Sequence, residues 1–125
     1  MPFAYWMLLA AAMLPYLTIV FVKYAGGRRF DNHRPRAWME QLSGWQQRGD
    51  WAHRNHFETF PIFLAAIFTA ETTGGAQGRI DLLAGVYVTV RIVYTALYLA
   101  NLATLRSTVW SLGLVVTIWI FLLGA

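Results

Sequence analysis

An arginine lies in the middle of an apolar stretch of this 125-residue chain, with tyrosines around it at helical spacing. Tyr87, Tyr94 and Tyr98 stand at offsets of minus four, plus three and plus seven from Arg91. On an α-helix these spacings place all four side chains on one face. A guanidinium flanked by phenol groups is suited to binding an anion that accepts several hydrogen bonds.

A second polar pair, Asn55 and Glu58, opens another apolar stretch and also shares one helix face. Ionisable groups inside a membrane are costly, so each requires a partner or a wet cavity. We therefore predict that Glu58 lies near Arg91, either directly or through a ligand. Two roles remain open for such a pair. It can lock two helices together, or it can form part of a site that also includes Arg106.

Other chemistry has weaker support in the sequence. His53 and His56 could bind a metal together with Glu58, but no further ligands are spaced to close a metal site. No nucleophile elbow, phosphate-binding glycine loop or dinucleotide fingerprint occurs. The chain has no cysteine, so any thiol chemistry must use a thiol from another molecule.

The elements that carry these residues are predicted from composition and hydropathy. The chain is 58% hydrophobic and only 13% charged, and its apolar residues form runs long enough to cross a membrane. Four transmembrane helices are predicted at residues 3–24, 51–72, 80–103 and 108–124, with a polar loop at residues 25–50. The predicted fold is thus an all-α, integral membrane four-helix bundle in one domain.

Charge is concentrated in the first loop. Seven of the ten Lys and Arg residues lie between Lys23 and Arg54, which favours a membrane-surface loop over a nucleic-acid interface. The positive-inside rule places loops one and three in the cytoplasm and both termini on the outer side of the membrane. Within the first loop, Trp38, Met39, Leu42 and Trp45 fit either a short amphipathic helix on the membrane surface or a loop anchored by tryptophan.

The segment from Ala52 to Pro61 resembles the signature of the MAPEG family, the membrane-associated proteins of eicosanoid and glutathione metabolism. Its core is an alanine, then Asn55, Glu58 and Pro61 at successive intervals of three residues. In the third span, Arg91, Tyr94 and Tyr98 are similar to the arginine and paired tyrosines of the family. The first loop looks like that of the bacterial branch, which implies a bacterial inner membrane.

The resemblance implies a homotrimer with active sites between neighbouring subunits, and it implies glutathione as co-substrate. Lipophilic small molecules are the second substrates of characterised members, and membrane lipid surrounds the protein. Glu58 is expected to hold the amino group of glutathione. The remaining positions that match glutathione contacts of the family are Arg48, His53, Asn55, Arg91, Tyr94 and Tyr98. Arg106 matches the catalytic arginine that stabilises the thiolate, since a thiol with a pKa of about 8.5 is mostly protonated at neutral pH.

Three functions follow from these patterns. The first is a glutathione-dependent membrane transferase or peroxidase that acts on a lipophilic electrophile. The second is a protein of the MAPEG fold that lacks this chemistry and binds a lipid or another anionic ligand. It is motivated by Trp51, which stands where glutathione-using members carry arginine. The third is a small proton-coupled exporter, motivated by the single embedded carboxylate of Glu58.

Overall fold

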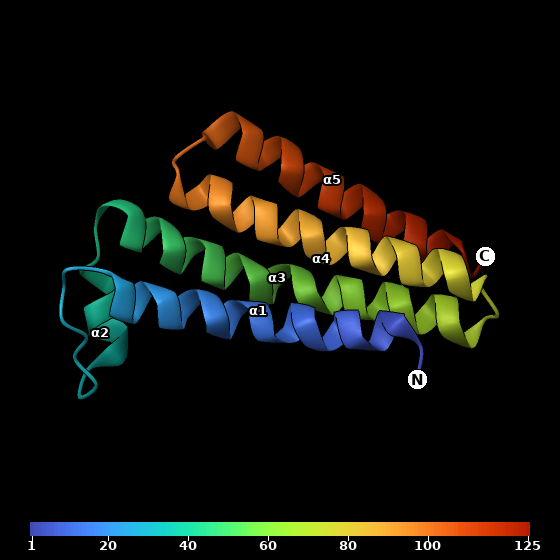
Figure 1. Cartoon of the computed structure of the whole chain (residues 1–125), viewed down its shortest axis with the longest axis horizontal. Helices are drawn as coiled ribbons and strands as arrows, with labels where there is room; N and C mark the ends of the chain where they lie inside the picture. The colour runs from blue at the N-terminus through green and yellow to red at the C-terminus, as the bar shows by residue number, and fades with distance from the viewer.

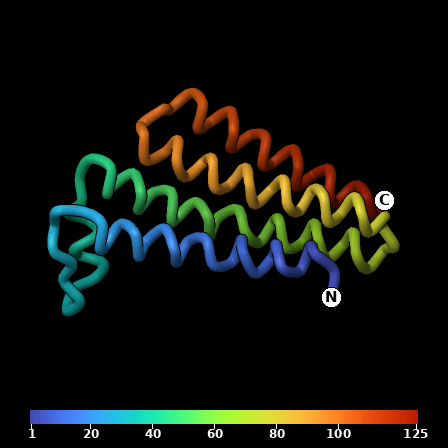
Figure 2. Tube along the Cα trace, viewed as in Figure 1, coloured from blue at the N-terminus to red at the C-terminus, as the bar shows by residue number.

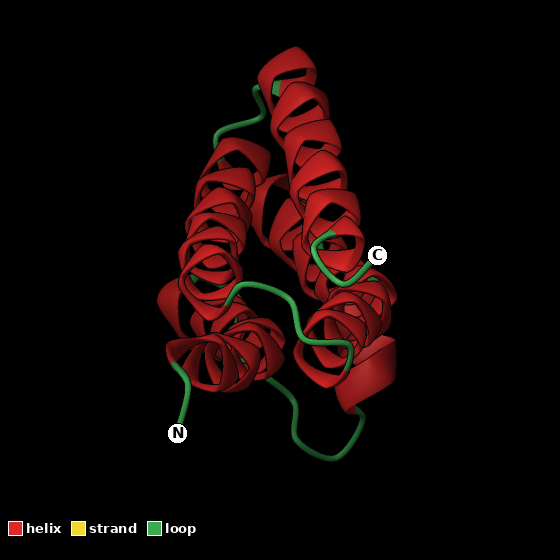
Figure 3. Ribbon diagram, turned by 90° about the vertical axis from the view of Figure 1, so that its right-hand side faces the viewer, coloured by secondary structure: helices red, strands yellow, loops and turns green.

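Four long helices and one short helix make up the computed structural model, which describes residues 1–125. The long helices are α1 (Phe3–Ala25), α3 (Gly44–Thr72), α4 (Gln77–Leu99) and α5 (Ala103–Leu122). They run side by side in alternating directions (Figure 1), and the view along their axes in Figure 3 shows them gathered into one bundle. The predicted four-helix bundle therefore has a fifth helix, α2 (Pro35–Glu40).

Three of the long helices, α1, α4 and α5, are long and apolar enough to cross a membrane. The fourth, α3, carries a polar first half but has 29 residues, which gives a length of about 44 Å. It runs between α1 and α4 (Figure 1) and also contacts α5. Only 29 of the 125 residues are buried, so most of the apolar surface faces outward. Together these features make the chain an integral membrane protein.

The core of the bundle includes several small residues, which let the helices approach closely. Five alanines belong to its main cluster of 13 buried residues: Ala4, Ala11, Ala66, Ala70 and Ala84. Phe63 of α3 stacks on Tyr87 of α4 with ring centroids 3.8 Å apart. This stacked pair fills the space between the two helices that carry the predicted site.

The short helix α2 lies at the end of the bundle where α1 ends and α3 begins (Figure 1). Pro35 starts it, as proline favours a first helical position. Trp38 and Leu42 are buried against Ile19 and Val22 of α1. Of the two possibilities for this loop, the helix is thus present, although Trp45 belongs to α3.

The two ends of the bundle carry different parts of the chain, as Figure 2 shows. Helix α2 and the α4–α5 connection lie at one end, and both termini lie at the other. At the end with the termini, the backbone N–H of Ala4 donates to Oδ1 of Asp81 at 2.8 Å. This bond satisfies one of the free amide groups in the first turn of α1. It also joins the start of α1 to the start of α4.

Helix boundaries differ from the sequence prediction in two places that matter for the site. Helix α3 begins at Gly44 rather than at residue 51, because Gln46, Gln47 and Arg48 are good helix formers although they are polar. Helix α5 begins at Ala103 rather than at residue 108. Arg106 therefore lies in the first turn of α5 and not in a loop. Asn101, which has a φ of 60°, makes the sharp turn that separates α4 from α5.

Candidate functional site

Arg91 lies on the face of α4 that packs against α3, and it is 3% exposed. Its Nη2 atom donates to Oδ1 of Asn55 at 2.9 Å and to Nδ1 of His56 at 2.9 Å. The guanidinium also lies over the ring of Tyr94, 4.2 Å from its centroid. Groups of α3 and α4 therefore surround the guanidinium, and Arg91 does not point toward lipid.

The orientation of the His56 ring follows from this contact. A guanidinium has no acceptor atom, so Nδ1 of His56 must accept and Nε2 must carry the proton. Nε2 lies 3.0 Å from Oγ1 of Thr95 and donates to it. The Thr95 hydroxyl in turn donates to the carbonyl of Arg91 at 2.9 Å. His56 is thus a neutral bridge that fixes the position of Arg91.

Glu58 joins the same network through Asn55. Nδ2 of Asn55 donates to Oε2 of Glu58 at 3.0 Å, while its Oδ1 accepts from Arg91. The amide therefore stands between the carboxylate and the guanidinium, which make no direct ion pair. Glu58 is exposed, so its other carboxylate oxygen is free to accept hydrogen bonds from a ligand.

An aromatic wall continues from this network to Arg106. The rings of Tyr94 and Tyr98 meet edge to face with centroids 5.6 Å apart. Arg106 lies over the Tyr98 ring, 4.4 Å from its centroid. All three residues line a pocket of about 380 Å³ between α4 and α5, which Trp110 also borders. Arg106 and the two tyrosines thus face one common space.

Trp51 of α3 contacts the same wall, at the position where glutathione-using members of the resembled family carry arginine. Its ring centroid is 6.3 Å from that of Tyr98, and it is 45% exposed. An aromatic ring therefore covers the outer side of Tyr98, and no cation is contributed from this position.

Two of the predicted site residues lie apart from this group. Arg48 donates to the carbonyl of Leu99 from Nε at 3.3 Å and from Nη2 at 3.0 Å. Nδ1 of His53 donates to the carbonyl of Pro15 on α1 at 2.7 Å. His53 and His56 are therefore bound to different helices, and the imidazoles do not converge on a shared metal position.

The charges of the group determine what kind of ligand it can bind. The free carboxylate oxygen of Glu58 suits an ammonium group, and the Arg106 guanidinium suits a carboxylate or a thiolate. Asn55 and Arg91 hold Glu58 in place through bonds that are already made. The residues present thus offer groups of both charges on neighbouring helices.

His56, Thr95 and Trp110 belong to the site, but the spacing argument did not identify them. His56 follows Asn55 directly, so it points about 100° away from it on a helix. The side chain of Arg91 is long, and its guanidinium nevertheless reaches both Asn55 and His56. The available signal was the arginine in an apolar helix, because its several donors require nearby acceptors.

Comparison with known proteins gives one family. Neither a curated protein nor a solved structure matches the chain. The sequence model of the MAPEG family, however, matches residues 3–125. That match includes every residue of the polar network and all four long helices. The chain therefore belongs to the MAPEG family.

Proposed function

We propose that the protein is a glutathione-dependent membrane transferase or peroxidase that acts on a lipophilic electrophile. One observation carries this proposal: a free carboxylate and a guanidinium lie on one connected wall of polar and aromatic side chains, in a chain that is otherwise largely apolar. That wall runs from Glu58 through Asn55 and Arg91 to Tyr98 and Arg106. Family membership supports the same chemistry.

In this proposal each residue has a defined task. Glu58 binds the ammonium of glutathione, and Asn55 orients Glu58. Arg106 stabilises the thiolate, because its guanidinium stays charged even when it is partly buried. The thiolate supplies the nucleophile, which forms a C–S bond as a halide or similar group leaves the electrophile with the bonding electrons. The proton of the thiol passes to solvent.

We also propose that all four long helices cross a bacterial inner membrane and that three copies assemble around the sites. The exposed positions of Glu58, Trp51 and Arg54 support this assembly, because a single chain would leave the polar half of α3 against lipid. A homotrimer would cover this face with a neighbouring subunit. Loops one and three would face the cytoplasm and both termini the periplasm.

Calorimetry and kinetics test the proposed chemistry in purified protein. Wild-type protein in detergent should release or absorb heat with millimolar glutathione, and it should conjugate 1-chloro-2,4-dinitrobenzene. Arg106→Ala should lower kcat/KM by about 100-fold or more, because one stabilising donor at the reacting atom is lost. Arg79→Ala serves as the matched control, since Arg79 is an exposed arginine in the first turn of α4. A folded protein that shows no heat with glutathione would reject the proposal.

A second function is favoured by Trp51, which packs on Tyr98. In this alternative the protein retains the MAPEG fold but binds a lipid or another anionic ligand in the same cleft. Trp51→Arg distinguishes the two functions. If the wild type binds no glutathione and Trp51→Arg does, the second function holds. If the wild type already binds and turns over glutathione, the first holds.

A further inference from the structure

Basic charge gathers at the end of the bundle where α2 lies. Between Lys23 and Gln41 the chain carries five cationic side chains and two carboxylates, which gives a net charge of +3. The only ion pair in the chain joins Arg54 to Asp50 on α3, so none of the five cations is paired with a carboxylate of the protein. The cations are Lys23, Arg28, Arg29, Arg34 and Arg36, and the carboxylates are Asp31 and Glu40.

Arg28 has a structural task, because it holds the loop that leads into α2. Its guanidinium donates from Nη1 to the carbonyl of Gln41 at 2.9 Å and from Nη2 to the side-chain oxygen of Gln41. Nε1 of Trp38 donates to the carbonyl of Arg29 at 2.8 Å, and the ring of Phe30 meets the Trp38 ring edge to face. These contacts fix the loop against α2 and bring Arg29 next to that helix.

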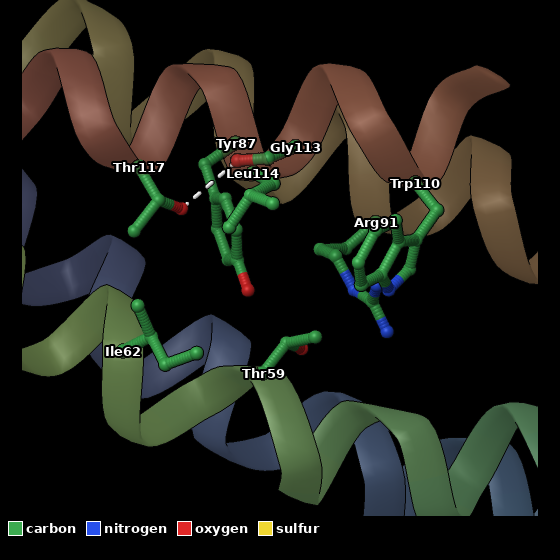
Figure 4. A pocket seen from close by; sticks show the side chains of 8 residues that line it. All are labelled: Thr59, Ile62, Tyr87, Arg91, Trp110, Gly113, Leu114 and Thr117. Carbon is green, nitrogen blue, oxygen red and sulfur yellow. Dashed lines mark hydrogen bonds between the residues drawn. The ribbon is translucent and has the colours of Figure 1, made fainter. Parts of the chain in front are cut away.

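Three arginines of this region, Arg29, Arg34 and Arg36, form what we call the arginine patch. All three are exposed, and none of their guanidinium groups donates a hydrogen bond to the protein or forms an ion pair with it. Arg91 differs from them, because it lies among side chains of α3, α4 and α5 (Figure 4). Its Nε atom also lacks a partner, but this atom is buried and closed to a ligand. The arginine patch, in contrast, is open to a partner outside the chain.

The arginine patch lies at the depth of the lipid headgroups. Helix α1 has 23 residues and a length of about 35 Å, so it reaches past a hydrocarbon core that is about 30 Å thick. Trp38 and Leu42 pack on Ile19 and Val22, which lie three to six residues before the end of α1. Helix α2 is therefore beside the last turns of α1 and not beyond them. Tyr24, which is 71% exposed, marks the same depth, since tyrosine favours the membrane interface.

Helix α2 and the loop before it also lie at one side of the bundle. Figure 1 and Figure 3 show them on the side opposite to α5. The last turns of α1 carry Leu17, Val20 and Phe21, each of which is more than half exposed. Lipid chains that cover these apolar side chains carry their headgroups at the level of α2. Headgroups and the arginine patch are thus brought together by the position of α1.

We propose that the arginine patch binds the headgroups of anionic phospholipids in the surrounding membrane. The phosphate oxygens of a headgroup accept hydrogen bonds from guanidinium groups. The negative charge of the lipid also neutralises cations that no carboxylate of the protein meets, and this attraction is strong only within a Debye length of the membrane surface. The arginine patch shares no residue with the wall from Glu58 to Arg106, so this proposal does not depend on the proposed function.

Electron paramagnetic resonance tests the proposal with the full chain in phosphatidylcholine vesicles. Traces of spin-labelled phosphatidylglycerol or spin-labelled phosphatidylcholine report how much of each lipid the protein immobilises. Wild-type protein should prefer phosphatidylglycerol by about fivefold at low ionic strength, as expected for one arginine close to an anionic headgroup. The preference should disappear in about 1 M NaCl, which screens charges at the surface. Equal association of both lipids at low ionic strength would overturn the proposal, and so would a preference that persists at high salt.

Variants locate the binding site. The triple variant Arg29→Gln, Arg34→Gln and Arg36→Gln should lose the preference for phosphatidylglycerol, and lysine at the same three positions should keep most of it, because lysine retains the charge. Arg34→Gln alone should lose part of the preference. Arg79→Gln is the matched control, since Arg79 is exposed in the first turn of α4 at the other end of the bundle. A wild-type preference in the triple glutamine variant, or an equal loss in Arg79→Gln and Arg34→Gln, would refute the arginine patch. If the triple variant does not fold, the comparison of the two single variants decides.

Inorganic phosphate distinguishes a lipid site from a site for a free anion. At matched ionic strength, sodium phosphate should release no more spin-labelled phosphatidylglycerol from the wild type than sodium chloride does. Selective release by phosphate would show that the arginine patch takes a soluble phosphate, and the proposal of a lipid site would then fail.

Discussion

The imidazole of His56 meets a guanidinium on one side and a hydroxyl on the other. His56→Leu removes the acceptor for Arg91 and leaves a second buried N–H of that residue unpaired. We expect a loss of about 2 kcal/mol in the free energy of unfolding, measured by titration with a denaturing detergent. His56→Asn keeps an oxygen acceptor near the position of Nδ1 and should recover most of this loss. Equal stability of His56→Leu and wild type would contradict the bridge.

At the same scale, the sequence predicted the direction of Arg91 but not all of its partners. Helical spacing and the cost of a charge in lipid predict that Arg91 faces the polar side of α3, and its bond to Asn55 agrees. Spacing does not specify which groups a long, flexible side chain reaches. His56 was missed for this reason. The place of Asn55 between Glu58 and Arg91 likewise depends on packing distances that a sequence pattern does not contain.

At the scale of the element, Arg48 stabilises the end of a helix. Its guanidinium donates twice to the Leu99 carbonyl, one of the carbonyls that the end of α4 leaves without a partner. Arg48→Met should lower the free energy of unfolding by about 1–2 kcal/mol and speed hydrogen exchange in residues 98–104. Gln47→Met is the control. If Arg48 only contacts a ligand, both variants will exchange at the wild-type rate.

Hydroxyl groups on the long helices mostly bond to their own backbone. Thr59, Thr89 and Thr117 each donate to the carbonyl four residues earlier. The hydroxyl donors of these residues are therefore hydrogen-bonded within their own helix, and they add little to the polarity of a helix face. The polar contacts between α3 and α4 are therefore made mostly by amide, carboxylate, imidazole and guanidinium groups.

The positions of the long helices were predicted better than their ends. Apolar runs identified where each long helix lies, since side chains that pack in the bundle or face lipid are apolar. The ends depend on local helix formation, which polar residues also support. Hydropathy therefore assigned residues 44–50 to a loop, although they form the first turns of α3. The same limit placed Arg106 outside α5.

At the scale of the whole molecule, the absence of cysteine permits a direct test of orientation. Single cysteines at Ser43 and Ala76 would mark opposite ends of the bundle, and both positions are exposed. In intact cells, a membrane-impermeant maleimide should label Ala76→Cys and should not label Ser43→Cys until the membrane is opened. The reverse pattern would place the basic loop outside and contradict the proposed topology.

The bond between Ala4 and Asp81 has a consequence for how the protein is made. The two residues are 77 positions apart, so the first helix leaves the ribosome well before its partner is synthesised. Until then, the amide of Ala4 has only water or lipid headgroups to bond with. The hydrogen bonding of the first turn of α1 is therefore completed only after α4, the third long helix, has been synthesised. A nascent chain truncated before residue 81 should hold its N-terminus less firmly than the finished chain does.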